Sequence, residues 1–163
     1  LVGGFDDEFQ GDMVPRVTYM GDPYSCAFSG KALTFFSSRN LASPELVEQR
    51  AIDERIDSVF YSDEYAAAIV RNTTGEYGSR LEVYKKDGTH VLSKEFNFEY
   101  TNADLDGDLI ILYNEDSCRI YNMSGTEKLD AAFDFPVSKI RKGRFPGTLV
   151  VTGPQQMREL KLR

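Results

Sequence analysis

A duplicated stretch constrains the fold of this chain more than any other feature of its sequence. Residues 80–96 align with residues 117–133 at an offset of 37 positions, and five of the 17 aligned positions are identical. In each copy an apolar, alternating stretch ends in Asp-Gly or Ser-Gly and a second stretch follows, which predicts a β-hairpin with glycine in its tight turn. The identical pairs are Tyr84 and Tyr121, Gly88 and Gly125, Thr89 and Thr126, Leu92 and Leu129, and Phe96 and Phe133.

Apolar runs upstream of these hairpins extend the repeat to a larger unit. They are continuous rather than alternating, which is typical of strands buried on both faces. The runs are Tyr65–Arg71, Asp108–Tyr113, Thr148–Thr152 and, less clearly, Ala32–Ser37. A short strand is predicted before each run, at Tyr24–Phe28, Ile56–Tyr61, Tyr100–Leu105 and Val137–Arg141. The sequence therefore predicts an all-β chain of four-stranded antiparallel meanders with a repeat of about 37–42 residues, that is, a β-propeller or partial propeller of about four blades.

The repeat divides a single propeller-like domain, residues 1–163, into units at about 21–55, 56–98, 99–135 and 136–163. The last unit ends on its third strand, and Val14–Met20 is a candidate for a fourth strand that would close a four-bladed ring. The alternative is half of a larger propeller, whose open blade edges could pair two copies as a homodimer. Residues 43–52 begin with a helix-start pattern, Ser43-Pro44, yet the repeat frame favours strands there.

The acidic balance of the chain argues against several kinds of partner. The net charge is −7 and the pI is about 4.8. Nucleic-acid binders need a basic surface to contact phosphates, and anionic membrane surfaces attract basic segments. The one basic cluster, residues 139–142 with Arg144, is interpreted as a solvated strand face. We therefore expect no nucleic-acid partner and no membrane contact by this part of the protein.

Few residues are candidates for chemistry. His90 is the only histidine, follows a predicted turn and is expected to face solvent, and no nucleophile stands out as its partner. Asp104, Asp106 and Asp108 partly resemble a calcium loop, but Leu109 occupies the place that needs glycine. We interpret this stretch as an acidic turn that leads into a buried strand. The sequence thus predicts no catalytic residue, no cofactor-binding residue and no metal ligand, and hence no enzyme.

Two cysteines, Cys26 and Cys118, lie far apart in the sequence and form no Cys-x-x-Cys motif. They could form a disulfide, or each could be a small buried apolar residue. The apolar, strand-like surroundings of both favour the second interpretation.

Tyrosines at predicted strand ends and loops are the remaining lead to a binding surface. Tyrosine is common at recognition surfaces because it offers rigid area together with a hydroxyl group. The alternative, given equal weight, is that these rings pack between blades. The six residues are Tyr19, Tyr24, Tyr61, Tyr65, Tyr77 and Tyr100.

The hairpins that end at Gly88 and Gly125 resemble blade hairpins of quinoprotein-like and WD40-like propellers, although the chain has no tryptophan. Residues 56–163, and 138–152 above all, resemble an uncharacterised bacterial family. The resemblance implies an N-terminal membrane anchor followed by a propeller on the outer side of a Gram-positive cell. This chain would then be the C-terminal portion of the extracytoplasmic part. The function of that family is unknown, so the resemblance implies no functional residue.

These observations predict a non-enzymatic module that binds an unidentified protein or glycan at the bacterial cell envelope. Irregular loops at the blade ends, such as residues 72–78, would form the binding surface. The rival hypothesis is a glycan hydrolase or lyase that uses acidic residues at the propeller mouth. Convergence of carboxylates from different blades on one cavity, with a basic group nearby, would favour the rival. A third alternative is a purely structural role in completing a ring.

Overall fold

The computed structural model describes residues 16–40, 42–73 and 75–162, and all regular elements in these ranges are strands. Four antiparallel sheets each take their strands in chain order. The first sheet contains β1 (Arg16–Tyr19), β2 (Tyr24–Phe28), β3 (Ala32–Ser37) and β4 (Glu45–Ala51), and the second contains β5 (Ile56–Tyr61), β6 (Tyr65–Arg71), β7 (Ser79–Lys85) and β8 (His90–Phe96). The third contains β9 (Asn102–Asp106), β10 (Leu109–Tyr113), β11 (Ser117–Asn122) and β12 (Glu127–Ala132), and the last contains β13 (Lys139–Lys142), β14 (Thr148–Thr152) and β15 (Met157–Lys161).

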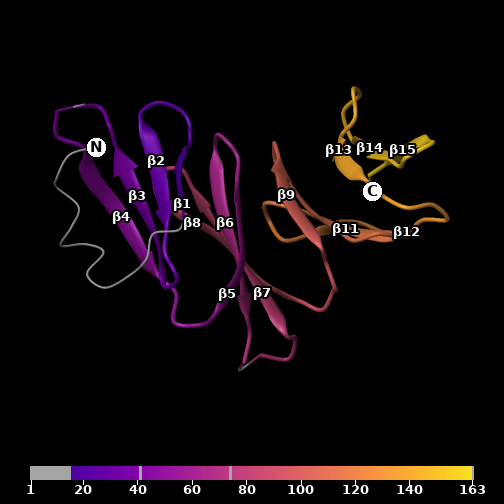
Figure 1. The fold of residues 1–163 in the computed structure, drawn as a ribbon, viewed down its shortest axis with the longest axis horizontal. Helices are drawn as coiled ribbons and strands as arrows, with labels where there is room; N and C mark the ends of the chain where they lie inside the picture. Colours follow the sequence, from indigo (N-terminus) through magenta and orange to yellow (C-terminus); the bar gives the residue numbers. More distant parts are fainter. Residues whose placement is uncertain (1–15, 41, 74, 163) are drawn as a thin grey trace.

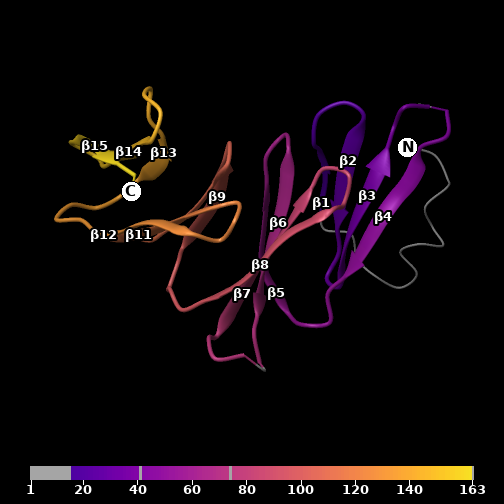
Figure 2. The ribbon, with the colours of Figure 1, turned by 180° about the vertical axis from the view of Figure 1, so that it is seen from behind.

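The sheets follow one another along an open arc, from the indigo first sheet to the yellow last sheet (Figure 1). The reverse view gives the same order, with the first and last sheets at opposite ends (Figure 2). The described residues therefore form consecutive propeller blades without closing a ring. This arrangement confirms the predicted all-β, partial-propeller fold of about four blades.

Three apolar cores lie between successive sheets, because alternate residues of each inner strand point to opposite faces. On β6, Ala66 and Ala68 face the first sheet, whereas Ala67 and Ile69 face the third. All five residues of β10 are buried in the same two-sided manner. Complete burial of a large aliphatic side chain contributes about 1.5–3 kcal/mol. The continuous apolar runs of the sequence therefore correspond to strands between two neighbouring sheets, as predicted.

A β-bulge recurs near the end of the third strand in each four-stranded sheet. It lies at Phe35/Phe36 in the first sheet, Val83/Tyr84 in the second and Ile120/Tyr121 in the third. Tyr84 packs on the preceding sheet, with its ring 6.0 Å from that of Phe35, and Tyr121 lies under Lys94. The repeated tyrosine of the sequence is therefore a residue that contacts the preceding blade at a bulge.

The first sheet differs from its predicted frame. Ala32–Ser37 is the third strand of its sheet, and the counterpart of β6 and β10 is Tyr24–Phe28. The described part of the segment considered for closing the last sheet, Arg16–Tyr19, is β1 and pairs with β2 instead. A short turn joins these two strands, with Tyr24 N donating to Gly21 O at 2.8 Å, and pairing between sequence neighbours requires little loop closure. The segment with a helix-start pattern forms strand β4, as the repeat frame favoured.

Candidate functional site

The acidic turn of the sequence meets the basic strand β13 at the junction of the third and last sheets. Lys139 Nζ donates to Asp104 Oδ2 at 2.6 Å, and the backbone N of Lys142 donates to Asp106 Oδ2 at 2.7 Å. Lys142 Nζ also donates to Asp108 Oδ1 at 2.5 Å. The carboxylates that partly resemble a calcium loop are therefore engaged by the neighbouring sheet. Within the described ranges, no group of three or more His, Cys, Asp or Glu side chains is arranged to hold a metal ion.

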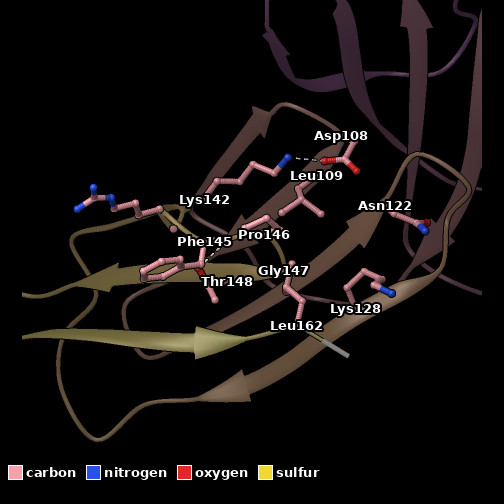
Figure 3. Close-up of a pocket in the computed structure, with 12 residues that line it drawn as sticks. Asp108, Leu109, Asn122, Lys128, Lys142, Phe145, Pro146, Gly147, Thr148 and Leu162 are labelled. Atoms are coloured by element: carbon pink, nitrogen blue, oxygen red, sulfur yellow. Dashed lines mark hydrogen bonds and ion pairs between the residues drawn. The ribbon is translucent and has the colours of Figure 1, made fainter.

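A hollow of about 710 Å³ lies beside the Asp108–Lys142 pair. The third sheet contributes Asn122 and Lys128, the β13–β14 loop contributes residues 143–147, and Leu162 follows β15. Figure 3 shows Lys142 extended toward Asp108, with Lys128 and the Phe145 ring on different sides of the space. Three structural elements that are distant in sequence thus surround one opening.

The lining of this hollow is richer in cations than the rest of the acidic chain. Lys128, Lys142 and Arg144 line it, against the single carboxylate of Asp108. Lys142 hydrogen-bonds Asp108 and thereby lowers the pKa of that carboxyl. In the part of the chain that the structure describes, no acidic side chain forms an ion pair with Lys128 or Arg144. Phe145, which is 63% exposed, adds an apolar group beside these charges.

His90 belongs to a polar network around Glu82. The side chain is 44% exposed, as the sequence predicted, and its Nε2 lies 3.0 Å from Glu82 Oε2. Ser93 Oγ donates to Glu82 Oε1 at 2.8 Å, and Arg80 Nε donates to the same oxygen at 2.6 Å. The serine hydroxyl thus contacts the glutamate and not His90, so Ser93 and His90 do not form a Ser-His pair. The buried Glu82 was not singled out from sequence, although a charged residue between Leu81 and Val83 was a signal.

The two cysteines are free and fully buried in different cores. Cys26 lies between the first two sheets, and Cys118 lies between the last two. Burial raises the pKa of each thiol to about 12. The structure therefore confirms the interpretation as buried apolar residues and excludes a disulfide between them.

Most of the six tyrosines pack between blades instead of forming a surface. Tyr24 and Tyr61 pack on the first core, and Tyr65 and Tyr100 pack on the second. Tyr100 also shares a hydrogen bond of 2.8 Å with Ser58. The exposed members are Tyr19 on β1, at 65%, and Tyr77 in the β6–β7 loop, at 42%.

A second hollow, of about 410 Å³, is lined by three carboxylates. Glu99 precedes β9, whereas Glu115 and Asp116 lie in the β10–β11 turn, so all three belong to the third sheet. Its described lining contains no cation. The arrangement therefore lacks the convergence from different blades, with a nearby base, that would favour a glycan-cleaving enzyme.

Solved structures similar to this chain share its fold at low sequence identity. The computationally designed protein Ika4 matches with a TM-score of 0.58 at 7% identity, over 94% of both chains. Sqt1 of Saccharomyces cerevisiae matches with a TM-score of 0.58 at 12% identity, over 97% of this chain and 48% of that one. BBS1N, solved in complex with ARL6DN, matches with a TM-score of 0.57 at 8% identity, over 93% and 52%. The chain thus spans about half the length of these natural proteins.

Comparison at the level of sequence identifies a family but no individual relative. No curated protein matches the sequence. Across the described ranges, no helix has the length and apolar character needed to cross a membrane. The profile of a family of unknown function, DUF5711, matches residues 1–162, and the chain belongs to this family.

Proposed function

We propose that this chain is a non-enzymatic protein-interaction module, and that its partner binds the hollow between the third and last sheets through acidic side chains. One observation carries the proposal. Lys128 and Arg144 line this hollow without a carboxylate partner in the described chain, although the protein has a net charge of −7. Cations that are free of internal ion pairs can pair with an incoming carboxylate at little cost.

The chemistry of the lining suits an acidic peptide with an apolar residue nearby. Arg144 can bind a carboxylate with two parallel hydrogen bonds, and Lys128 adds a second positive charge. The exposed ring of Phe145 offers apolar area beside them. Thr148 Oγ1 donates to Phe145 O at 2.8 Å and Gly143 N donates to Thr148 O at 2.8 Å, so the loop that carries Arg144 and Phe145 already has internal hydrogen bonds that reduce the ordering needed on binding. A glycan ligand remains the alternative, and it would rely on Phe145 more than on the cations.

The fold of the similar structures is compatible with a protein partner. BBS1N was solved in complex with ARL6DN, which is a protein–protein complex on a related fold. At 8% identity this likeness concerns the fold alone, so the hollow of this chain has to be tested directly.

The test is a fluorescence-anisotropy titration with a labelled peptide of alternating Glu and Phe residues. A peptide of the same length with Gln in place of Glu is the comparison. We expect the acidic peptide to bind at least about tenfold more tightly, and the difference to shrink as salt is added. The double variant Lys128→Glu, Arg144→Glu should lose this preference. Arg141→Glu is the matched control, because Arg141 is an exposed arginine outside the hollow. Equal binding of both peptides to the unchanged protein would contradict the proposal.

The rival enzymatic function depends on the hollow of Glu99, Glu115 and Asp116, because three carboxylates line one space there. A glycan hydrolase would use one as a general acid and another as base or nucleophile. Release of reducing ends from cell-wall glycans, lost in Glu115→Gln, would favour the enzyme over the interaction module.

A location at the bacterial cell envelope is part of this proposal and is motivated by the resemblance of residues 56–163 to membrane-anchored bacterial proteins. The parent protein would then be degraded when protease is added to intact cells. Protection until the cells are lysed would contradict an extracytoplasmic location. The predicted homodimer through open blade edges is a separate prediction, which the solution mass from light scattering tests.

A further inference from the structure

Among the four described sheets, the second is the one whose first strand has an interrupted pairing. A β-bulge in β5 separates Ile56 from Ser58, so Asp57 has no partner residue on β6. The corresponding strands β1, β9 and β13 pair with their neighbours without a register shift. A bulge re-aims a side chain away from the regular alternation of its strand, and bulges are over-represented next to functional sites. The bulge therefore frees the Asp57 side chain from the alternation that sets its neighbours.

Asp57 holds two arginines. Its Oδ1 lies 3.2 Å from Arg55 Nε, and its Oδ2 lies 3.6 Å from Arg71 Nε. The backbones of the two arginines are also joined, because Arg71 N donates to Arg55 O at 2.8 Å. Arg55 lies in the β4–β5 connection and Arg71 ends β6, and both places lie along the lower edge of the two overall views (Figures 1 and 2). Three charged side chains therefore meet at one end of the second sheet.

This cluster has an excess of positive charge, although the whole chain has a net charge of −7. Every other arginine ion pair in the described ranges has at least one carboxylate for each arginine. Here two arginines share the single carboxylate of Asp57. The side chains of Arg55 and Arg71 are 72% and 55% exposed, whereas that of Asp57 is 26% exposed. Two guanidinium groups thus face solvent above a better shielded carboxylate.

The Nη atoms of both arginines are the donors available to a ligand. The two ion pairs reach Asp57 through Nε, and no further ion pair engages either guanidinium in the part of the chain that the structure describes. A guanidinium presents its N–H groups as a planar fork that matches the two oxygens of a carboxylate. Because Asp57 already holds both forks, they lose less side-chain freedom on binding than unattached arginines would.

Two hydroxyl groups lie beside the cluster. Ser58 directly follows Asp57, and its Oγ lies 2.8 Å from Tyr100 Oη. Two hydroxyls have two protons, and their shared hydrogen bond uses one, so the other can be donated to an oxyanion. Burial raises the pKa of Tyr100 above its ordinary value, the hydrogen bond with Ser58 opposes this rise, and the charge of Asp57 adds to it. The Tyr100 hydroxyl therefore lies within the field of the Asp57 carboxylate and stays protonated.

We propose that Arg55 and Arg71 bind a single carboxylate group, which the hydroxyls of Ser58 and Tyr100 border. Two guanidinium groups against the carboxylate of Asp57 leave one excess positive charge, and one monoanion balances it. The acidic hollow that Tyr100 also lines repels an extended polyanion. An isolated carboxylate, of a small organic acid or of a peptide C-terminus, therefore suits the cluster better than a phosphate dianion or a nucleic acid.

The test is an NMR titration of the whole, ¹⁵N-labelled chain, in which the Nε–Hε signals of Arg55 and Arg71 report binding directly. Sodium propionate is added at constant ionic strength, with sodium chloride as the reference. We expect saturable shifts with propionate, with a dissociation constant of roughly 10 mM, because two charge-assisted hydrogen bonds provide the affinity. Chloride should cause no saturable shift, and phosphate at neutral pH should bind more weakly than propionate.

A tripeptide distinguishes the two sources of the carboxylate. It is titrated with a free C-terminus and, for comparison, with an amidated one. Tighter binding of the free tripeptide than of propionate would assign the site to a peptide C-terminus. Equal or weaker binding would assign it to a small organic acid. The amidated tripeptide should cause no saturable shift in either case.

Two variants test the parts of the cluster, with the backbone amides of Asp57 and Ser58 as the readout. The double variant Arg55→Lys, Arg71→Lys keeps the charge but removes both forks, so propionate should bind at least about fivefold more weakly. Asp57→Asn adds one excess positive charge and should shift the preference from propionate toward phosphate. Arg141→Lys, at an exposed arginine on β13, is the matched control and should leave propionate binding unchanged. Circular dichroism should be the same for all these proteins.

This site is separate from the hollow of the proposed function, since none of its residues lines that hollow. The Lys128→Glu, Arg144→Glu protein should bind propionate at unchanged strength, and the double lysine variant should keep its preference for the acidic peptide. Failure of one site is therefore distinguishable from failure of the other.

Three results would overturn the proposal of a carboxylate site. The first is an equal response to chloride and propionate, which would mean a general effect of salt. The second is tighter binding of phosphate than of propionate by the unchanged protein. The third is the lack of any saturation up to about 100 mM propionate, a concentration at which even a weak specific site would fill.

Discussion

The third and last sheets share one strand plan but differ on the face that points away from the preceding sheet. In the third sheet this face contains Leu109, Ile111 and Ile120, and all three are buried against the last sheet. The equivalent positions of the last sheet hold Thr148, Val150 and Glu159, which are partly or fully exposed. In the described residues the same strand plan therefore occurs with this face buried and with it exposed, and the side chains on the face differ accordingly.

The comparison is tested most severely by exchanging residues at the equivalent positions Ile120 and Glu159. Ile120→Glu places a carboxylate in a core without a partner, and we expect a loss of about 4 kcal/mol or more in the free energy of unfolding. That is a large share of the total stability of a small domain. Urea denaturation followed by circular dichroism measures it.

The reverse exchange is the matched control. Glu159→Ile changes an exposed residue, and we expect the free energy of unfolding to change by no more than about 0.5 kcal/mol. It would instead enlarge an apolar surface and favour self-association, visible as a higher solution mass. A loss below about 1 kcal/mol in Ile120→Glu would contradict the burial of that face.

The space around two turn glycines also differs between the second sheet, with Gly88, and the last sheet, with Gly147. Gly88 has φ +83°, and a Cβ atom there would lie 2.5 Å from Glu48 Cβ of the first sheet. Gly147 has φ +71°, but a Cβ atom there would meet nothing within 4 Å. Gly147→Ala has only the left-handed strain of about 1–2 kcal/mol, whereas Gly88→Ala adds overpacking of about 1–3 kcal/mol. Thermal unfolding of both variants compares them, and equal losses would show that the Gly88 turn is not packed.

The sequence predicted the repeating scaffold because its signals are local. Tyr84 with Gly88 and Tyr121 with Gly125 mark the bulge and turn of each hairpin, so the period could be read directly. In the first blade the sequence predicted β3 as the inner strand, whereas β2 holds that place in the structure. The error arose because β3 is buried at all six positions and resembles an inner strand more than Tyr24–Phe28 does. Burial from both sides is a tertiary property, and an apolar run does not identify which strand of a sheet receives it.

The candidate site was far less predictable from the sequence. Asp104 and Asp108 were interpreted as an acidic turn, and Lys139 and Lys142 as a solvated strand face, but no local signal indicated that the two would meet. Such ion pairs depend on how one blade is placed against the next. Lys128 and Phe145 were not singled out either, because isolated lysine and phenylalanine residues are ordinary in any strand or loop.

A smaller effect on stability is expected at Arg119 on β11 and Arg158 on β15, which occupy equivalent positions opposite Leu112 and Val151. Arg119→Ala removes a charge-assisted hydrogen bond to Asp130 and the contact with Phe98, and we expect a loss of about 1.5 kcal/mol in the free energy of unfolding. Arg158→Ala should cost about 0.5 kcal/mol, because its pair with Asp134 is largely solvated. Chemical denaturation of both variants decides it. A larger loss of stability for Arg158→Ala than for Arg119→Ala would mean that another segment of the chain already covers the free edge of β15.

The smallest effect concerns the ion pairs that join the two sheets. Lys142 lowers the pKa of Asp108, so this carboxyl stabilises the folded state above its ordinary pKa of 3.8, and the contribution disappears as the pH falls through the lowered folded value. Asp104 raises the pKa of Lys139, whose contribution is therefore present below 10.5 and disappears as the pH rises through the raised folded value. These exposed pairs should each contribute only a few tenths of a kcal/mol.

Unfolding free energies of Asp108→Asn and of the unchanged chain, measured between about pH 2 and pH 7, isolate the acidic branch. The two curves should differ near neutral pH and converge in acid, whereas Glu76→Gln, at an exposed loop residue, should follow the unchanged chain throughout. A difference that persists unchanged to the lowest pH would mean that Asp108 acts through its shape and not its charge. The charge of Asp108 would then add nothing to the junction of the two sheets, which also contains the Lys139–Asp104 pair and the apolar core around Ile111 and Val151.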